Sequence, residues 1–216
     1  MAHASIGGSP HPPEPDCPLC PRLLAYRHAN RAANPLWFNA PVPSFGPADA
    51  PLLVVGMAPG VKGANRTGRP FTGDYAGLLL YQTLLKFGLA HGDYDARPDD
   101  GLTLDRVRIV NAVRCVPPAN LPQPLEVRTC NPFLAAELQA PTIRAILTLG
   151  VLAHAATLRA LGLPVTRPKF KHGQIIELPD GRLIADSYHV SRYNTNTGVL
   201  TTAMFESVIA DLAARL

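Results

Sequence analysis

The segment of residues 56–77 constrains the fold of this chain more strongly than any other part. It follows an apolar run, Pro51–Val55, which predicts a buried parallel strand, and it precedes Leu78–Phe87, which predicts a helix. A strand-to-helix connection of about twenty residues is far longer than usual, and such loops in compact domains are usually functional. Its six glycines let main-chain N–H groups turn toward a ligand. We therefore expect this loop to form part of a functional site, with an ordinary surface loop as the alternative.

Strand and helix patterns alternate along the rest of the chain. Strand patterns cover residues 107–113 and 145–150, and residues 173–185 resemble a hairpin through Pro179-Asp180-Gly181 whose second arm could join the sheet. Helical patterns cover residues 21–30, 124–138, 151–161 and 201–216. The connections at residues 91–104 and 117–122 are expected to be a surface loop and an extended, proline-rich loop. Strands that alternate with helices predict an α/β fold, a three-layer α/β/α sandwich with a central parallel four-stranded sheet.

The size and composition of the chain suit one globular domain. With 216 residues, 47% of them hydrophobic and 17% charged, the chain can bury a full core. We expect residues 1–16 to be a disordered tail rich in Pro and Gly, and residues 17–216 to form a single domain. No apolar run is long enough to span a membrane, and the first ten residues lack the features of a signal peptide. We therefore expect a protein of the cell interior, without a membrane partner.

Four cysteines, Cys17, Cys20, Cys115 and Cys130, carry the only strong metal signal in the sequence. In a protein of the cell interior, a CxxC pair with two further cysteines indicates a metal site rather than disulfides. Four thiolates are enough for a structural zinc ion or an iron–sulfur cluster, and the spacing alone does not separate the two. Four unrelated thiols are the alternative. A shared site would tie the N-terminal segment to the middle of the fold.

Three polar segments are expected to meet at one edge of the sheet. They are the loop of residues 56–77, the segment Asn111–Asn120, and the donor-rich segment Ser187–Gly198. Each follows a predicted strand, and ligands of open parallel sheets bind beyond the carboxyl ends of the strands. We therefore predict the functional site at this edge.

The side chains of these segments suit the cleavage of an N-glycosidic bond. The sequence has no GxGxxG or GxxxxGK[ST] loop, no G-x-S-x-G and no HExxH. What remains includes the carboxylate of Asp74, the imidazole of His189, the amides of Asn111 and Asn120, and the ring of Phe71. A carboxylate can stabilise a cationic sugar and position water, and a His or main-chain N–H can stabilise the oxyanion of a leaving pyrimidine. An aromatic face can receive an extruded base, and an amide can read its edge.

Each of these residues also has a plain structural interpretation. Asp74 can simply cap the helix that follows it, His189 can be a structural histidine, and Phe71 can belong to the core. The basic stretch Arg167–His172 can contact phosphates or be a solvated face.

At these residues the sequence resembles the uracil-DNA glycosylase superfamily, and most closely its type 5, iron–sulfur-containing bacterial and archaeal branch. The resemblance covers nearly the whole chain from Cys17 onward. The segments that carry it are Gly56-Met57-Ala58-Pro59-Gly60, residues 63–74, residues 111–120, His189-Val190-Ser191-Arg192 and Asn194–Gly198, together with the four cysteines.

The resemblance implies the roles of individual residues. A structural [4Fe–4S] cluster would be held by Cys17, Cys20, Cys115 and Cys130. The residues expected to line the uracil pocket or contact DNA are Gly56, Met57, Ala58, Pro59, Gly60, Phe71, Asn111, Ser191, Arg192, Tyr193 and Asn194. Many superfamily members have an acid or asparagine at the position of Met57, whose thioether cannot activate water. The catalytic group is therefore expected to be Asp74, and Asn120 is the amide at a position that matches the family pattern. His189 is expected to serve the second family motif, which begins with it.

The implied partner is double-stranded DNA containing uracil or another deaminated base such as hypoxanthine. We expect a monomeric, monofunctional glycosylase, because no lysine in the motifs is placed to form a Schiff base. Arg192 or Tyr193 is expected to wedge into the vacated base stack. Two competing classes remain open from the sequence: a non-enzymatic iron–sulfur or zinc DNA-binding module on the same fold, and a small electron-transfer protein.

Overall fold

Buried apolar runs form the central sheet of the computed structural model, which describes residues 12–216 of the chain. The strands β1 (Leu52–Gly56) and β5 (Ala145–Leu149) are buried at every position. They pair in parallel with each other, and the parallel strands β4 (Val107–Asn111) and β7 (Leu183–Ser187) lie on their outer sides. Strands buried on both faces are typical of parallel sheets covered by helices. The four predicted parallel strands are all present.

The sheet has one strand more than predicted. The first arm of the hairpin is β6 (Ile175–Glu177), which pairs antiparallel with β7, so the strand order is β4-β1-β5-β7-β6. The predicted hairpin is confirmed, and its second arm does join the sheet. The short arm joins as well because β7 would otherwise leave its main-chain groups unpaired along an open edge.

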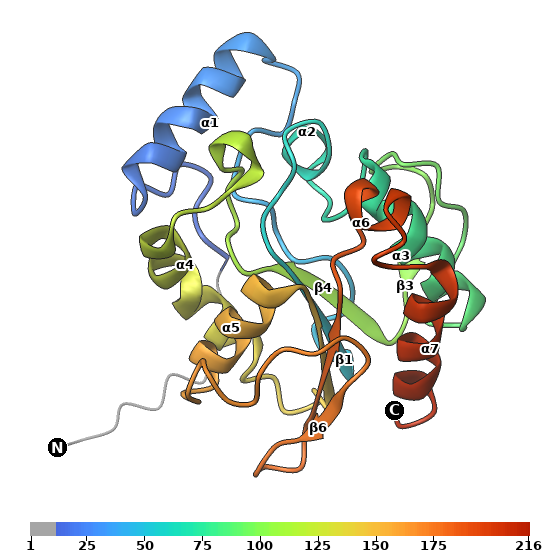
Figure 1. The fold of residues 1–216 in the computed structure, drawn as a ribbon. Helices are drawn as coiled ribbons and strands as arrows, with labels where there is room; N and C mark the ends of the chain where they lie inside the picture. Colours follow the sequence, from blue (N-terminus) through green and yellow to red (C-terminus); the bar gives the residue numbers. More distant parts are fainter. Residues whose placement is uncertain (1–11) are drawn as a thin grey trace, which may run out of the picture.

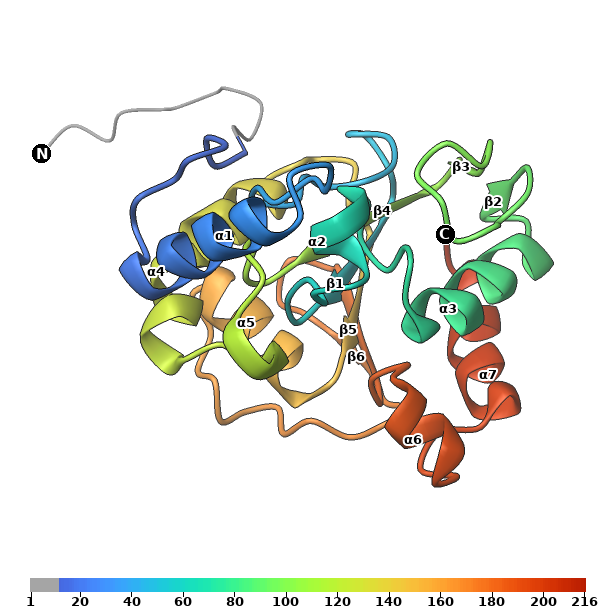
Figure 2. The ribbon, with the colours of Figure 1, turned by 90° about the horizontal axis from the view of Figure 1, so that it is seen from above.

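Helices cover both faces of the sheet, as the three-layer prediction requires. Figure 2 shows the sheet between α4 and α5 on one side and α3 and α7 on the other, and Figure 1 shows α1 above α4. The helices are α1 (Pro21–Ala33), α2 (Ala64–Thr67), α3 (Tyr75–Lys86), α4 (Pro124–Glu137), α5 (Val151–Ala160), α6 (Arg192–Asn196) and α7 (Thr202–Ala213). Within the described residues no helix is long and apolar enough to cross a membrane.

Two separate cores lie on the two faces of the sheet. Along β1, Leu52 and Val54 belong to the core beneath α3 and α7, whereas Leu53 and Val55 belong to the core beneath α4 and α5. This alternation follows from the two-residue period of a strand. It keeps β1 in the middle of the molecule, so the loop that leaves its carboxyl end starts from a rigid point.

Several predicted loops contain short regular elements. The long loop after β1 includes α2, the connection 91–104 includes the strand pair β2 (Ala90–His91) and β3 (Thr103–Leu104), and the proline-rich segment includes a 3-10 turn, η1 (Pro118–Asn120). The segment after β7 includes α6. Helices of one turn or little more and strands of two residues are too short to display a periodic pattern, so the sequence did not reveal them.

The expected N-terminal tail divides at the start of the described residues. Residues 1–11 lie outside them. The last residues of the expected tail contact α1: Asp16 forms an ion pair with Arg31 at 2.9 Å, and the carbonyl of Pro15 accepts a hydrogen bond from Arg27 at 3.3 Å. These contacts hold the chain just before Cys17 against the domain.

Candidate active site

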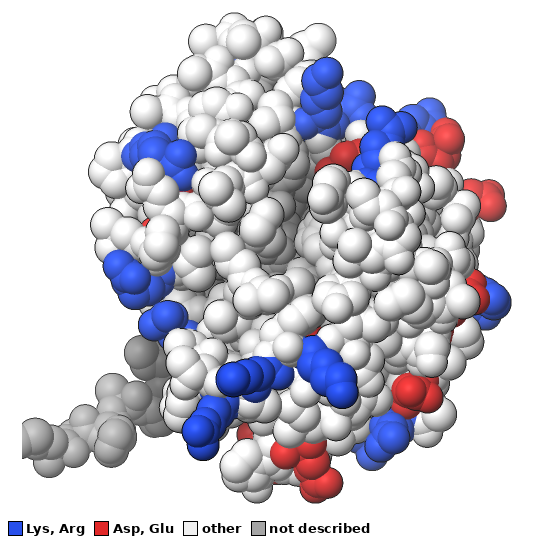
Figure 3. All heavy atoms as spheres, in the orientation of Figure 1, with Lys and Arg blue, Asp and Glu red and all other residues white. Residues whose placement is uncertain are grey.

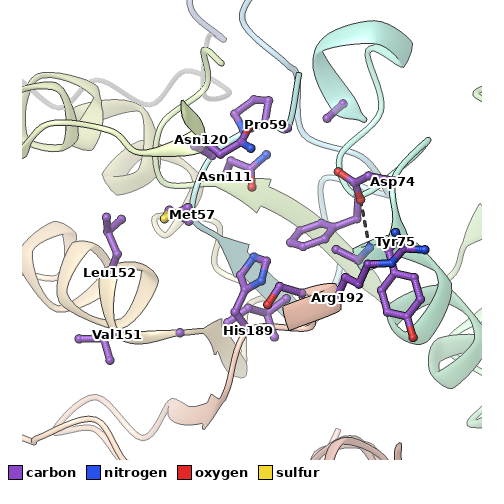
Figure 4. Close-up of a pocket in the computed structure, with 18 residues that line it drawn as sticks. Met57, Pro59, Asp74, Tyr75, Asn111, Asn120, Val151, Leu152, His189 and Arg192 are labelled. Atoms are coloured by element: carbon purple, nitrogen blue, oxygen red, sulfur yellow. Dashed lines mark hydrogen bonds between the residues drawn. The ribbon is translucent and has the colours of Figure 1, made fainter. Parts of the chain in front are cut away.

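A cavity of about 520 Å³ opens at the carboxyl ends of the parallel strands, where the three polar segments meet. Figure 3 shows it as the hollow in the middle of the face drawn, and Figure 4 shows the side chains that line it. The predicted site residues that line the cavity are Met57, Ala58, Pro59, Gly60, Phe71, Asp74, Asn111, Asn120, His189, Ser191 and Arg192. The predicted convergence of the three segments is therefore confirmed.

Three predicted residues lie next to the cavity without lining it. Gly56 is buried behind it, where an added Cβ would overlap the ring of Phe71 and the amide of Asn111. Asn194 donates a hydrogen bond from Nδ2 to the carbonyl of His189 at 2.8 Å, so it supports the site from outside. Tyr193 is 73% exposed.

Asp74 caps a helix and also lines the cavity. It is the N-cap of α3, and its Oδ1 accepts a hydrogen bond from the main-chain N–H of Ala76 at 3.2 Å (Figure 4). Its carboxylate also lines the cavity, and Oδ2 lies against the loop at Gly60 and Gly63, where an added Cβ would crowd it. Burial raises the pKa of Asp74 above its usual value, while the N–H groups of the first helical turn oppose the rise.

Phe71 also belongs to the core and to the cavity at once. It is 6% exposed and packs in the core beneath α3, yet it lines the cavity. Its φ of 52° lies in the left-handed region, which is costly for a bulky side chain. Its main chain is held there by the hydroxyl of Tyr94, which donates to the Phe71 carbonyl at 3.1 Å, and by that of Tyr81, which donates to the Pro70 carbonyl at 2.6 Å.

His189 faces Phe71 across the cavity. The two ring centroids are 6.1 Å apart, with 35° between the ring planes. Burial lowers the pKa of His189 below its usual value, because a buried imidazolium loses its hydration. The imidazole is therefore neutral at pH 7, with one ring nitrogen that donates and one that accepts.

The two asparagines differ in burial and conformation. Asn111 ends β4, is 3% exposed, and its amide points into the cavity between Met57 and Asp74 (Figure 4). Asn120 lies in η1 at the rim, is exposed, and has a φ of 56° directly after Ala119 at 55°. Two successive non-glycine residues in the left-handed region are unusual and often mark functional segments.

The sequence analysis missed one wall of the cavity. Leu149, Gly150, Val151 and Leu152, at the junction of β5 and α5, all line it. The rule that ligands bind beyond the carboxyl ends of parallel strands would have found them, since they follow the third predicted strand. These residues carry no polar side chain, so nothing in their sequence indicated a binding site. Tyr75 was missed as well; the guanidinium of Arg192 lies 5.3 Å from the centroid of its ring.

The four cysteines come together on the side of the sheet covered by α1 and α4. All four line one small second cavity, with Cys115 and Cys130 buried and Cys17 and Cys20 half-buried. Within residues 12–216 no three Cys, His, Asp or Glu side chains are grouped closely enough to hold a single metal ion. Four thiols that line one cavity are the donor set that a zinc ion or an iron–sulfur cluster requires.

Hydrogen-bond donors face these sulfur atoms. The main-chain N–H of Arg114 points at Cys130 Sγ at 3.4 Å, and Nη1 of the fully buried Arg27 lies 3.5 Å from Cys115 Sγ. Burial raises the pKa of Cys115 to about 12 and that of Cys20 to about 11, so metal binding must displace protons from these thiols. Donors aimed at sulfur are one of the means by which proteins stabilise iron–sulfur clusters.

Comparison with known proteins identifies the family to which this fold and site are similar. The family model of the uracil DNA glycosylase superfamily matches residues 43–213, which include all three loops around the cavity.

Individual relatives match almost the whole chain. A type-5 uracil-DNA glycosylase of Thermus thermophilus is 45% identical over 202 residues, which are 90% of this chain and 91% of that protein. Type-5 uracil-DNA glycosylases of Pyrobaculum aerophilum and Mycobacterium tuberculosis are 40% and 42% identical. Those matches cover 92% and 90% of this chain, and 88% and 76% of the respective relatives.

Proposed function

The chain belongs to the uracil-DNA glycosylase superfamily, and we propose that it is an enzyme of the type-5 kind that releases uracil from DNA. The reaction hydrolyses the N-glycosidic bond of an extruded nucleotide and leaves an abasic site in the DNA. One observation carries the proposal: a carboxylate, a neutral imidazole, a buried amide and an aromatic ring from three separate loops line the same cavity. An enzyme that cleaves a base from its sugar needs these groups together.

Phe71 and Asn111 would recognise the base. The ring of Phe71 offers a flat apolar surface on which an extruded pyrimidine can stack. The amide of Asn111 has both donor and acceptor atoms, so it can pair with the edge of uracil. Since the Asn111 side chain is almost fully buried at the end of a strand, its position is set before the base arrives.

Asp74 and His189 would stabilise the charges that develop during bond cleavage. As the bond breaks, the sugar becomes cationic and the base becomes an oxyanion. The Asp74 carboxylate would stabilise the cation and position the attacking water, while the N–H of neutral His189 would donate to the oxyanion. Removal of one such donor typically slows an enzyme about 10²–10³-fold.

Asn120 is the second candidate for the water-positioning role. Its amide lies at the rim of the cavity, and Met57, whose thioether can neither donate nor accept a proton usefully, lines the same cavity. Asp74 is the first candidate because only a carboxylate also offsets the positive charge on the sugar.

We propose double-stranded DNA as the partner and hypoxanthine as a further substrate. We also propose that the protein acts as a monomer in the cell interior, where its DNA lies. The cavity volume of about 520 Å³ leaves room for a base larger than uracil. Figure 3 shows basic side chains around the hollow, where the phosphates of a bound duplex would approach.

We propose that Cys17, Cys20, Cys115 and Cys130 hold a [4Fe–4S] cluster with a structural role. Such a cluster would tie the segment before α1 to the residues that follow β4 and to α4. A brown protein that absorbs near 400 nm would support the proposal. A colourless protein with stoichiometric zinc would contradict it.

Base release from a duplex oligonucleotide with a single uracil tests the proposed reaction. Released bases are detected as alkali-sensitive strand breaks, beside Asp74→Ala and His189→Ala variants and an unmodified duplex. Cleavage at uracil that drops about 10²-fold or more in both variants would support the reaction and the site. If the wild type binds DNA but releases neither uracil nor hypoxanthine, the protein is instead a binding module on a glycosylase fold.

A further inference from the structure

A stretch without acidic residues runs from α5 to β6, on one side of the cavity. Between Glu137 and Glu177 the sequence contains no Asp or Glu. Within it, Arg167, Lys169 and Lys171 are exposed, and in the described part of the chain none of them forms a salt bridge. Figure 3 shows basic side chains in a row below the hollow, over the orange segment that links α5 to β6 in Figure 1.

A buried histidine–aspartate pair holds this segment in place. His154 of α5 and Asp186 of β7 are both nearly inaccessible, and His154 Nδ1 lies 2.7 Å from Asp186 Oδ1. The other ring nitrogen of His154 lies 2.9 Å from the carbonyl oxygen of Pro168, to which it must donate. The Asp186 carboxylate also accepts from the hydroxyl of Thr148 at 2.5 Å and from the amide of Gln174 at 2.5 Å.

The same anchor orients the lysine side chains outward. The carbonyl of Lys169 accepts from Gln174 Nε2 at 2.6 Å, and the main-chain N–H of Lys171 lies 3.4 Å from Asp186 Oδ2. Between them the ring of Phe170 packs edge-on against the His154 ring, with centroids 5.8 Å apart. Phe170 is half-buried against His154, whereas Lys169 and Lys171 on either side of it are exposed to solvent.

The segment is joined directly to the loop that carries His189. The main-chain N–H of Tyr188 donates to His172 Nδ1 at 3.1 Å, and the two rings stack with centroids 4.8 Å apart and 10° between their planes. Tyr188 immediately precedes His189. The cationic segment therefore keeps a constant position relative to the cavity, as a phosphate-binding surface requires.

We propose that Arg167, Lys169 and Lys171 contact backbone phosphates of the duplex beside the extruded nucleotide. Hydrogen bonds with His154, Gln174 and Asp186 already hold the main chain of this segment, which reduces the loop ordering that binding would otherwise require. Contacts between this surface and the phosphates would not depend on the base sequence of the DNA. They would hold the duplex in register with the cavity. The inference rests on the proposed function, since it assumes that the cavity acts on DNA.

The test is the salt dependence of DNA binding by a Lys169→Gln/Lys171→Gln variant. The probe is a duplex of 30 base pairs with a tetrahydrofuran abasic analogue, titrated between 50 and 200 mM salt. Each phosphate contact contributes about 0.9 to the steepness of the plot of log K against log salt. The slope of the variant is therefore expected to be shallower than that of the wild type by roughly 2, and its affinity about tenfold lower. The single-turnover rate of uracil release at saturating protein is expected to stay within about twofold of the wild type.

An Arg106→Gln/Arg215→Gln variant is the matched control. Both arginines are exposed, and they lie before β4 and after α7, at the opposite edge of the sheet from the cavity. A lysine variant that binds with the slope and affinity of this control would overturn the proposed surface, even if uracil is released normally. If the lysine variant alone shows a shallower slope and the wild type releases no base, the result would support the DNA-binding surface and overturn the proposed reaction.

Discussion

The rings of Phe71 and His189 lie 6.1 Å apart across the cavity, although they belong to loops that follow two strands not adjacent in the sheet. Each ring belongs to a residue whose main-chain carbonyl accepts a hydrogen bond from a side chain. The carbonyl of Phe71 accepts from Tyr94, and the carbonyl of His189 accepts from Asn194. The space between the rings is thus defined in part by hydrogen bonds to main-chain carbonyls from side chains that do not line the cavity.

Replacement of Asp74 by Asn separates its two roles. Asn caps helices as well as Asp does, so we expect the melting temperature to stay close to the wild-type value. Loss of the carboxylate charge is expected to slow uracil release about 10²-fold or more in single-turnover assays. Asp74→Ala is the comparison: it should lose the same activity and, in addition, about 1 kcal/mol of stability. A fully active Asn variant would leave Asp74 as a cap only and would move the catalytic role to Asn120.

Gly77→Ala is expected to displace Phe71. An added Cβ at this position in α3 would overlap the carbonyl oxygen of Phe71 and crowd the hydroxyl of Tyr94. We expect a loss of roughly 1–3 kcal/mol in the free energy of unfolding, together with a higher KM for the uracil duplex. Leu78→Ala, at the next and exposed position, is the control and should leave KM unchanged. Equal behaviour of the two variants would show that the Phe71 main chain has room to move.

The single-turnover rate is expected to be insensitive to His189 protonation near neutral pH. Since burial lowers the pKa of His189 below 6.5, the imidazole stays neutral as the pH falls from 8 to 6.5, and a change in rate should begin only at lower pH. The His189→Asn variant should be about 10²-fold slower and lack that change. An inflection at or above pH 6.5 that disappears in His189→Asn would contradict the neutral role.

The His154–Asp186 pair is expected to make stability decrease as the pH rises. Burial opposes the charged form of His154, but its bonds to Asp186 and Pro168 prevail and raise its pKa above 6.5. The folded state then binds the proton more tightly than the unfolded state. Its contribution is complete below pH 6.5 and is lost as the pH rises through the folded pKa.

Urea unfolding of wild type and His154→Gln between pH 6 and pH 9 checks this prediction. The variant should be up to about 3–5 kcal/mol less stable at pH 6, and the difference should shrink at higher pH. His91→Gln removes an exposed His–Asp pair and is the control, with an expected change within about 1 kcal/mol at every pH. If the stability difference between wild type and His154→Gln grows with pH, the pKa of His154 is not raised on folding and the prediction is refuted.

Cys115→Ser is expected to remove the absorbance near 400 nm and to lower the melting temperature. Cys115 is buried among the four thiols, so its loss should open the proposed cluster site and free the segment before α1. Uracil release per folded molecule should fall much less than in Asp74→Asn, because the cluster is proposed to be structural. A variant that melts normally but is inactive would instead place the cysteines in the reaction.

The main architecture was predictable because its causes are local. Apolar runs such as Leu52–Val55 and the helical periods that alternate with them specify the parallel strands and the covering layers without any knowledge of contacts. The strand order places the carboxyl ends together, so the meeting of Asp74, Asn111 and His189 also followed. The place of β6 as a fifth strand of the sheet and the cavity wall at Gly150–Leu152 did not follow. The hairpin pattern does not say that both arms belong to the sheet, and the wall has no polar side chain.

By itself, the sequence determined the layered α/β fold, the edge of the sheet where the site lies and the types of chemical group present there. Only the tertiary structure decided that Asp74 caps α3 and also lines the cavity, and that Phe71 belongs to the core and also lines the cavity. It alone paired His154 with Asp186 beneath the cationic segment. The physical reason is that periodicity records the environment of a residue along its own strand or helix. Hydrogen bonds and ring contacts between distant segments depend on packing, which no local pattern encodes.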